Sequence, residues 1–257
     1  MKIVHQRLIM LITHKIKLLH KIPYLDESQS FAFPSVKSAT SEGIIAIGGN
    51  LSPGMLLSAY RQGIFPWYSV GDPIIWWSPD PRCVIFPFEL HVSRSSKKIL
   101  HKGRFRVTLD TSFVDVINSC KTTPRPHQHG TWITEEMLRA YVRLHNLGYA
   151  HSIEVWDGTF LAGGLYGVSL GGCFFAESMF RRVSNASKIA LIKLVKLCEI
   201  LGFDMIDCQV PSPHLIKAGA RVIPREDFIN LLKKSLKKNT LKGNWGSSCY
   251  ASLITKV

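Results

Sequence analysis

Apolar and polar positions in the second half of the chain alternate between strand-like and helix-like patterns. Strands are predicted at residues 104–109, 150–156, 159–169, 173–180 and 203–210. Helices are predicted at residues 111–120, 134–148, from 185 or 187 to 202, and after Pro224. The pair Asp157 and Gly158 between two strand patterns is a strong hairpin signal. This order of elements predicts an α+β fold with a mixed sheet.

The first third of the chain carries a shorter pattern of the same kind. Residues 44–47 form an apolar run that predicts a short strand. Ser52 and Pro53 are suited to begin a helix, which should run through Tyr60 and end at Gly63. A small unit of secondary structure is therefore expected here.

A segment rich in aromatic residues and proline follows this helix. Residues 64–82 hold three Trp and four Pro and are expected to be mostly loop. We therefore predict a small N-terminal domain over residues 30–85, a larger domain over residues 86–240 and a tail over residues 241–257.

The first 29 residues are interpreted as a basic, dispensable extension. Residues 8–12 are an apolar run of five, far short of the roughly 20 residues that span a bilayer. Lys15 and Lys17 follow where a secretory cleavage site needs small residues. No stable membrane insertion is expected. A basic amphipathic helix that lies on a membrane or on RNA stays open as the alternative.

The composition of the chain predicts a polyanionic binding partner. The chain has 32 Lys and Arg against 18 Asp and Glu, a net charge of +14. Such an excess favours binding to nucleic acid or an anionic membrane surface, and an idle basic surface is the alternative. The six cysteines contain no Cys-x-x-Cys pair, which favours a reducing, cytoplasmic location without disulfides.

The strand pattern at residues 206–210 brings two polar side chains together. Side chains alternate across a strand, so Asp207 and Gln209 should share one face, opposite Ile206, Cys208 and Val210. A carboxylate and an amide are costly to bury without partners. They are candidates for chemistry, and a solvent-exposed face or a paired structural role is the alternative.

Glu177 is a second candidate carboxylate. It lies among apolar residues in the segment Cys-Phe-Phe-Ala-Glu-Ser-Met-Phe, residues 173–180. A carboxylate in such a run indicates a pocket, and a salt bridge at a strand end is the alternative.

The segment after residue 181 argues against coenzyme A. Acetyltransferases carry a glycine-containing turn there whose backbone cradles a pyrophosphate, but this chain has Asn185 and Ser187 at the glycine positions. Close approach of the backbone to a pyrophosphate needs residues without a Cβ. The nearby cations remain candidates for contact with other phosphates: Arg181, Arg182 and Lys188.

No metal or nucleotide signature stands out. His127 and His129 lie near Cys120, but no fourth ligand has typical spacing, and we predict no metal site. Phosphate-binding glycine loops and a serine nucleophile elbow are also missing from the sequence.

Eight blocks of sequence together resemble the bacterial leucyl/phenylalanyl-tRNA–protein transferases. The likeness covers about residues 31 to 235, and the order and intervals of the blocks make the resemblance specific. The blocks are residues 44–53, 60–82, 130–134, 140–156, 163–168, 176–180, 185–191 and 207–210.

The resemblance implies a fold and an activity. The fold would be a small N-terminal domain and an acetyltransferase-like (GNAT-type) C-terminal domain over residues 86–240. The activity would be transfer of Leu or Phe, and less well Met, from aminoacyl-tRNA to proteins that begin with Arg or Lys, which marks them for degradation. No cofactor is implied, and we expect a monomer.

The resemblance also assigns roles by position. Catalytic residues would be Asp207, Gln209 and Glu177. The 3′-terminal adenosine of tRNA would contact Tyr60, Trp67 and Trp132. The aminoacyl side chain would enter a pocket formed by Leu165, Phe174, Ala176, Met179, Leu191, Leu194 and Ile206.

This chain departs from the family at a few of its positions. Asn50 stands where Asp is common, and Leu165 and Leu194 stand where other members carry Met and Phe. The two leucines would alter the shape of the pocket.

The implied mechanism gives Asp207 the task of orienting the acceptor amine and taking its proton, while Glu177 would hold a cationic amine. Three rival functions stay open. They are a coenzyme A-dependent N-acetyltransferase, a non-catalytic RNA-binding module, and a tRNA-dependent transferase with a peptidoglycan or lipid acceptor.

Overall fold

The computed structural model describes residues 16–90, 92–124, 131–247 and 249–256. The chain divides into two compact units after Asp80. The second unit thus begins at Pro81, where the sequence pattern placed the boundary at residue 86. None of the helices in these described ranges is long and apolar enough to cross a membrane.

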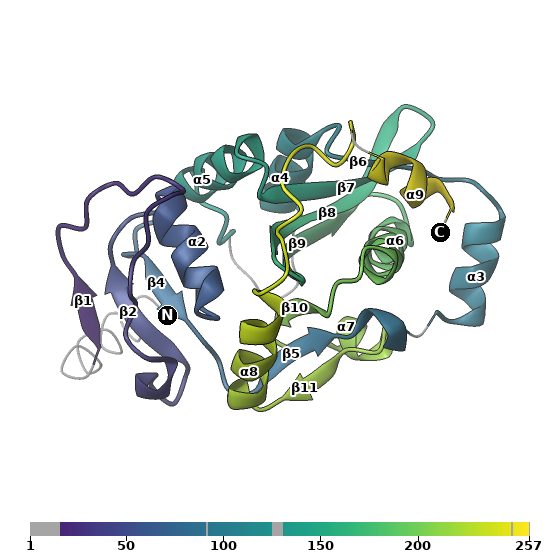
Figure 1. The fold of residues 1–257 in the computed structure, drawn as a ribbon. Helices are drawn as coiled ribbons and strands as arrows, with labels where there is room; N and C mark the ends of the chain where they lie inside the picture. The colour runs from purple at the N-terminus through teal and green to yellow at the C-terminus, as the bar shows by residue number, and fades with distance from the viewer. Residues whose placement is uncertain (1–15, 91, 125–130, 248, 257) are drawn as a thin grey trace. The chain divides into compact units, whose positions relative to one another are not determined.

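The described part of the first unit holds a small sheet with a helix packed against it (Figure 1). Its sheet has the order β1-β2-β4-β3 among the described residues. The predicted strand is confirmed as β2, and the predicted helix as α2, with Ser52 at its N-cap and Pro53 at its first position. The elements are β1 (Lys17–Leu19), η1 (Val36–Ser38), β2 (Ile44–Gly48), α2 (Pro53–Arg61), β3 (Phe65–Pro66) and β4 (Ile75–Trp77).

Residues 16–29 are not a detached extension. Strand β1 pairs in parallel with β2, and Leu19 is buried. Asn50 Nδ2 donates to the carbonyl oxygens of Ile22 and Pro23, at 2.9 and 3.1 Å. An aspartate could not make these two bonds, which gives a physical reason for Asn50 in this chain. Residues 1–15 lie outside the described ranges.

The prediction that residues 64–82 are mostly loop is confirmed, although the segment also holds the short strands β3 and β4. Strand β4 pairs with both β2 and β3, and Trp76 is fully buried, with its Nε1 donating to the Gly48 carbonyl. The indole therefore serves as a core side chain, and the apolar content of this segment reflects strand formation despite its prolines.

The second unit is built on a mixed seven-stranded sheet, which confirms the α+β class. Its strand order is β11-β5-β10-β9-β8-β7-β6 among the described residues, with β9 and β10 parallel and the other pairs antiparallel. The strands are β5 (Arg82–Ile85), β6 (Arg106–Leu109), β7 (Ala150–Asp157), β8 (Phe160–Leu170), β9 (Cys173–Arg181), β10 (Met205–Gln209) and β11 (Arg221–Ile223).

Helices cover both faces of this sheet (Figure 1). A Cβ on Gly163 would meet Ala186 of α6, whereas one on Gly164 would meet Val116 of α4, so these helices lie on opposite faces. The helices are η2 (Pro87–Glu89), α3 (Arg94–His101), α4 (Phe113–Thr122), α5 (Glu135–Asn146), α6 (Ala186–Ile200), α7 (Pro213–Lys217), α8 (Arg225–Ser235) and α9 (Tyr250–Lys256).

Local signals in the sequence account for most of these elements. The hairpin of β7 and β8 turns at Asp157 and Gly158, where Gly158 has a φ of +63°. Thr134 caps α5 by accepting from the Met137 amide. Helix α4 continues two residues beyond its predicted end at Cys120. In the second unit, the elements that the pattern missed are β5, η2, α3, α7, β11 and α9.

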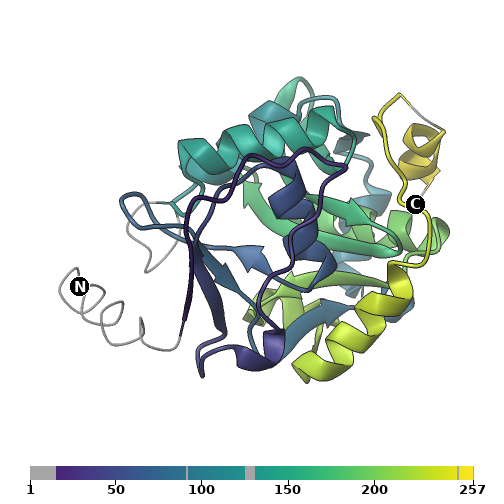
Figure 2. The same ribbon diagram turned by 60° about the vertical axis from the view of Figure 1, so that its left-hand side comes forward.

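The chain that joins α8 to α9 contributes one core side chain, Trp245. It runs along one side of the second unit (Figures 1 and 2). Trp245 is 1% exposed, and its backbone amide donates to Asp110 Oδ2 at 2.8 Å. The same oxygen lies 2.8 Å from Nδ1 of His151, whose ring stacks on Trp245 with centroids 3.8 Å apart.

Glu154 on β7 gives the fold a pH-dependent contribution. It is fully buried, it accepts from the hydroxyls of Ser152, Thr108 and Thr111, and burial raises its pKa. The folded chain therefore holds this proton more tightly than the unfolded chain does. The resulting stability is complete below the ordinary pKa of glutamate, about 4.3, and is lost as the pH rises through the raised pKa.

We expect Glu154→Gln to remove this contribution, because glutamine does not titrate. The free energy of unfolding, measured by urea between pH 4 and 7, should fall less with rising pH in the variant than in the wild type. Parallel curves for the two proteins would show that Glu154 does not titrate in this range.

Candidate active site

Asp207 lies at a buried position in the middle of the large sheet. On β10 it pairs with Phe175 of β9 on one side and with Val84 of β5 on the other. It is fully buried. A carboxylate at such a position requires a charged or hydrogen-bonding partner.

That partner is Arg82, at the start of β5. Arg82 Nε donates to Asp207 Oδ1 at 2.8 Å, and the terminal nitrogen Nη2 donates to Oδ2 at 2.7 Å. Both side chains have no exposed surface, and the guanidinium also lies 4.5 Å from the centre of the Phe228 ring. The bidentate pair fixes the orientation of the carboxylate.

Gln209 does not simply share the face of Asp207, as regular alternation predicts. The register between β10 and β5 shifts between these two residues, and Gln209 has a φ of +54°. Its backbone amide donates to Asp207 Oδ1 at 3.0 Å. The predicted pair thus exists, but it is joined through the backbone of Gln209 at an irregularity in the strand.

The side chain of Gln209 keeps a donor available. The residue is 8% exposed, and its Nε2 makes no hydrogen bond with any other described residue. A buried amide donor without a partner is rare, because it loses its bond to water without replacement. This donor is therefore a candidate contact for a substrate.

Glu177 lies in a similar irregularity on β9. Tyr166 pairs with Ser178 and Gly167 with Ala176, so Glu177 is the extra residue of a bulge. Glu177 is half-buried, and its Oε2 accepts from the Tyr141 hydroxyl at 2.9 Å.

The two bulges come at the same level of the sheet. Pairing between the parallel strands β9 and β10 ends at Phe175 and Asp207. Glu177 and Gln209 each follow two residues later, on adjacent strands. Bulges redirect side chains and end pairing, often beside active sites. Glu177 and Gln209 thus flank the place where the parallel pairing of the sheet stops.

The seven residues predicted for the aminoacyl pocket all belong to one apolar cluster. Five of them are at most 1% exposed, and Ala176 and Met179 pack against the cluster. Leu191 also lines a cavity of about 340 Å³. The five are Leu165, Phe174, Leu191, Leu194 and Ile206.

Cysteines near Asp207 are not suited to act as nucleophiles. Burial, and then the charge of Asp207, raises the pKa of Cys83 to about 11. Burial likewise raises the pKa of Cys173 and of Cys208 well above the usual range. The thiolate is the reactive form, so these thiols are inert near neutral pH.

The three aromatic residues predicted to contact adenosine differ in exposure. In the first unit, Tyr60 is fully buried within α2, whereas Trp67 exposes 42% of its surface beside Trp77, with ring centroids 5.8 Å apart. In the second unit, Trp132 is half-buried just before α5.

The predicted phosphate contacts separate into two groups. Arg181 and Lys188 line one cavity together. The Arg182 guanidinium instead donates to Ser119 Oγ at 3.0 Å and lies over the rings of Phe160 and Phe180. Arg182 thus packs on a different part of the unit from the other two.

Metal ligands do not cluster in the described part of the chain. No group of three or more His, Cys, Asp and Glu side chains there is arranged to hold an ion. His127 and His129 lie outside the described residues.

Comparison with known proteins decides the family. Residues 84–233 match the family described as leucyl/phenylalanyl-tRNA protein transferase, and residues 49–80 match its N-terminal domain. The chain belongs to this family. The resemblance drawn from the eight sequence blocks is confirmed.

Several relatives in the family are similar over nearly their whole length. A leucyl/phenylalanyl-tRNA–protein transferase of Syntrophus aciditrophicus (strain SB) is 59% identical over 88% of this chain and 95% of its own. One of Anaeromyxobacter dehalogenans (strain 2CP-C) is 51% identical over 83% of this chain and 92% of its own. One of Legionella pneumophila (strain Corby) is 49% identical over 84% of this chain and 96% of its own.

Among solved structures, similarity is distant. L-PGS from Bacillus licheniformis aligns over 62% of this chain and 66% of its own, with a TM-score of 0.40 and 8% identity. A likeness at this level carries no argument about the family's fold type.

Arg82, the site residue with the strongest contacts, was not predicted from the sequence. The signal was present, because the residues that follow it, Cys-Val-Ile-Phe, are an apolar run typical of a buried strand. Tyr141 was also missed, and a lone tyrosine on a helix gives no signal of its partner.

Proposed function

We propose that this chain is an aminoacyltransferase that moves Leu or Phe, and less well Met, from aminoacyl-tRNA to the N-terminal Arg or Lys of acceptor proteins. The transfer marks the acceptor for degradation in an N-degron pathway. The observation that carries the proposal is the 49–59% identity to leucyl/phenylalanyl-tRNA–protein transferases over more than four-fifths of the chain.

The reaction needs no further energy source. The neutral α-amine of the acceptor attacks the ester carbonyl carbon of the aminoacyl group. A peptide bond forms, the bond between the carbonyl carbon and the ribose oxygen breaks, and the amine proton ends on that oxygen. The ester is already activated, so neither ATP nor a metal is required by the chemistry.

Gln209 is the residue that we place against the reacting atoms. Negative charge develops on the ester carbonyl oxygen during attack, and a fixed donor aimed at this oxygen lowers the barrier. The buried Nε2 of Gln209, without a partner among the described residues, supports this role.

Asp207 acts through Gln209. It is fully buried, and its oxygens accept from Arg82 and from the Gln209 amide. Such a carboxylate is poorly accessible to an incoming amine. We assign Asp207 as a positioning residue and the departing ribose oxygen as the final proton acceptor.

Glu177 is suited to the cationic end of the acceptor. Glu177 is half-buried on the neighbouring strand, and Tyr141 orients its carboxylate. An acceptor that begins with Arg or Lys brings positive charge to the site, and a charge-assisted bond to Glu177 would hold it.

The finer features of the fold and of substrate binding complete the proposal. The second unit is assigned to the acetyltransferase-like type, supported by its parallel pair β9 and β10 within a mainly antiparallel sheet. Within the second unit, Trp132 would stack on the terminal adenosine, and the apolar cluster around Phe174 and Leu191 would take the aminoacyl side chain. The enzyme is expected to be a cytoplasmic monomer.

The central experiment offers Leu-tRNA, Phe-tRNA and an unrelated charged tRNA to peptides that begin with Arg, Lys or Ala. Transfer of Leu and Phe to the Arg and Lys peptides alone is expected. Binding of tRNA without any product would favour an RNA-binding module, and binding of coenzyme A in a titration would favour an acetyltransferase.

Gln209→Leu tests the assigned donor. The rate at saturating substrates should fall by about 10²–10³, the effect of removing one donor to a developing oxyanion. The unfolding free energy should change little, because Nε2 makes no bond to another described residue. Transfer is measured with Phe-tRNA and an Arg peptide.

Ser235→Ala is the matched control for Gln209→Leu. It removes another buried polar atom without a partner among the described residues, on α8. Its transfer rate should equal that of the wild type. A Gln209→Leu enzyme with normal transfer would remove Gln209 from the reaction.

A further inference from the structure

Cations from three elements gather around two adjoining cavities of the second unit. Each cavity has a volume of about 340 Å³. One is lined by Arg181 at the end of β9, Lys188 in the first turn of α6, and Lys217 and His214 of α7. The other shares Lys188, His214 and Lys217.

The charges around these cavities are uncompensated within the described chain. No Asp or Glu is among the described residues that line either cavity. Arg181, Lys188 and Lys217 make no ion pair with a described carboxylate. Partial burial, followed by the charges of Lys188 and Arg181, lowers the pKa of His214. Positive charges held close together in a hollow favour an anion there.

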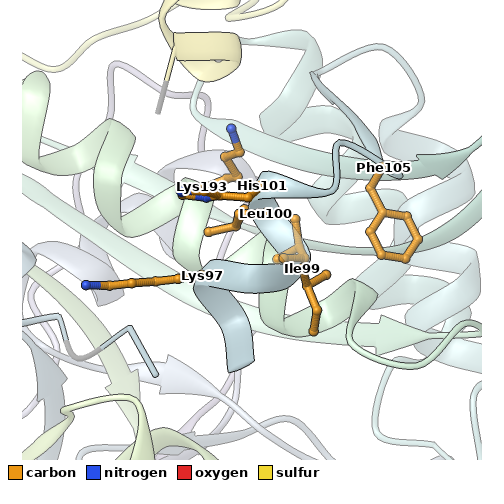
Figure 3. Close-up of a pocket in the computed structure, with 7 residues that line it drawn as sticks. Lys97, Ile99, Leu100, His101, Phe105 and Lys193 are labelled. Carbon is orange, nitrogen blue, oxygen red and sulfur yellow. The ribbon is translucent and has the colours of Figure 1, made fainter. Parts of the chain in front are cut away.

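A third cavity between α3 and α6 differs in character. It is lined by Lys97, His101 and Lys193 together with the apolar side chains of Ile99 and Phe105 (Figure 3). Lys193 Nζ already donates to the Ile254 carbonyl at 3.0 Å. Its cation has a structural partner, unlike those around the first two cavities.

The cation-lined cavities adjoin the apolar cluster assigned to the aminoacyl group. Lys188, Leu191 and Ile192 lie on one face of α6, three and four residues apart, and all three line the same cavity. Leu191 also belongs to the apolar cluster. The apolar cluster at Leu191 is thus followed by the cations Lys188, Lys217 and Arg181. A ligand with an apolar group at one end and phosphates next to it would match this order.

We infer that Arg181, Lys188, Lys217 and His214 form a phosphate-binding site for the RNA strand whose 3′ end carries the aminoacyl ester. This inference rests on the proposed function. A free phosphate or phosphomonoester shares the recognising chemistry, and the experiment separates these sources.

The test removes two of the charges and measures how RNA binding depends on salt. Binding of a tRNA whose aminoacyl ester is replaced by a stable amide is titrated at several KCl concentrations. For Lys188→Gln/Lys217→Gln, the slope of log Kobs against log[KCl] should become shallower by about 1.5, because each phosphate contact contributes about 0.7–0.9.

A matched control removes two charges elsewhere. Lys233 and Lys234 are exposed on α8 and line none of the three cavities. Lys233→Gln/Lys234→Gln should keep the wild-type slope. Thermal unfolding of all variants checks folding, and Lys217→Gln alone, at an exposed position, should reduce the slope by about 0.8 if the double variant does not fold.

A substrate without phosphates separates this inference from the proposed function. Lys188→Gln/Lys217→Gln should lose more transfer from Phe-tRNA to an Arg peptide than from 3′-O-phenylalanyl-adenosine, which has no phosphate for the two lysines to contact. Absence of transfer from Phe-tRNA in the wild type would defeat the proposed function, whereas the salt dependence is read from binding alone.

Two results would overturn the inference. The first is a slope for Lys188→Gln/Lys217→Gln equal to that of the wild type. The second is binding of inorganic phosphate to the wild type, seen as a shift of the His214 ring signals by NMR and lost in the variant, together with an unchanged RNA slope. That second result would assign the site to free phosphate.

Discussion

Arg82→Met should destabilise the second unit by about 3–5 kcal/mol, the typical cost of removing one partner from a buried ion pair. Asp207 would be left as a buried carboxylate without its guanidinium, and both side chains have no exposed surface. In a chain of this size the midpoint of thermal unfolding should fall by roughly 10 °C. Calorimetry and urea unfolding measure the effect.

A double variant tells whether the pair matters for stability or for chemistry. Arg82→Met/Asp207→Leu replaces the ion pair with apolar side chains of similar size, a change that is often neutral or stabilising. Most of the lost stability should return, but transfer should not, because Gln209 loses the acceptor of its backbone amide. A double variant as unstable as the single one would mean that the buried charge is not the cause.

Asp207→Asn should reduce the transfer rate by about 10²-fold or more, since a small displacement of a group at the reaction centre has effects of that size. Asn can still accept from the Gln209 amide, but it places an NH2 group against the Arg82 guanidinium and disturbs the geometry at the bulge. The rate is measured below the unfolding temperature of the variant, at saturating Phe-tRNA.

The pH profile separates a positioning role from a general base. If Asp207 acts through Gln209, the variant should keep the shape of the wild-type profile, and Asp207→Asn/Gln209→Leu should be no slower than the slower single variant. Loss of the acidic limb in Asp207→Asn would instead identify Asp207 as the proton acceptor.

Local patterns were sufficient for the parts of the fold that local interactions determine. The hairpin at Gly158 requires a positive φ that Gly adopts readily, and the Thr134 cap satisfies an amide three residues away. Elements that depend on distant partners were missed. β5 occupies its place only because it pairs with β10 and β11, whose sequences lie more than a hundred residues later.

In the candidate site, too, the features set by local sequence were predicted and those set by distant pairing were not. Asp207, Gln209 and Glu177 could be singled out because polar residues in apolar strand patterns are conspicuous. The bulges that redirect Gln209 and Glu177 arise from the register between strands, which a single segment does not encode. The bond from Arg82 to Asp207 likewise depends on a pairing across 125 residues of sequence.

The contact between Asp110 and Trp245 has a consequence for how the protein is made. Asp110 and His151 are synthesised early, but the backbone amide that donates to Asp110 and the indole ring that stacks on His151 both belong to Trp245, which leaves the ribosome far later. The second unit therefore cannot complete its core during synthesis until residue 245 has emerged, even if its earlier strands have already paired. Its folding is expected to finish in one late step, and a nascent chain arrested before Trp245 should remain sensitive to protease in this unit.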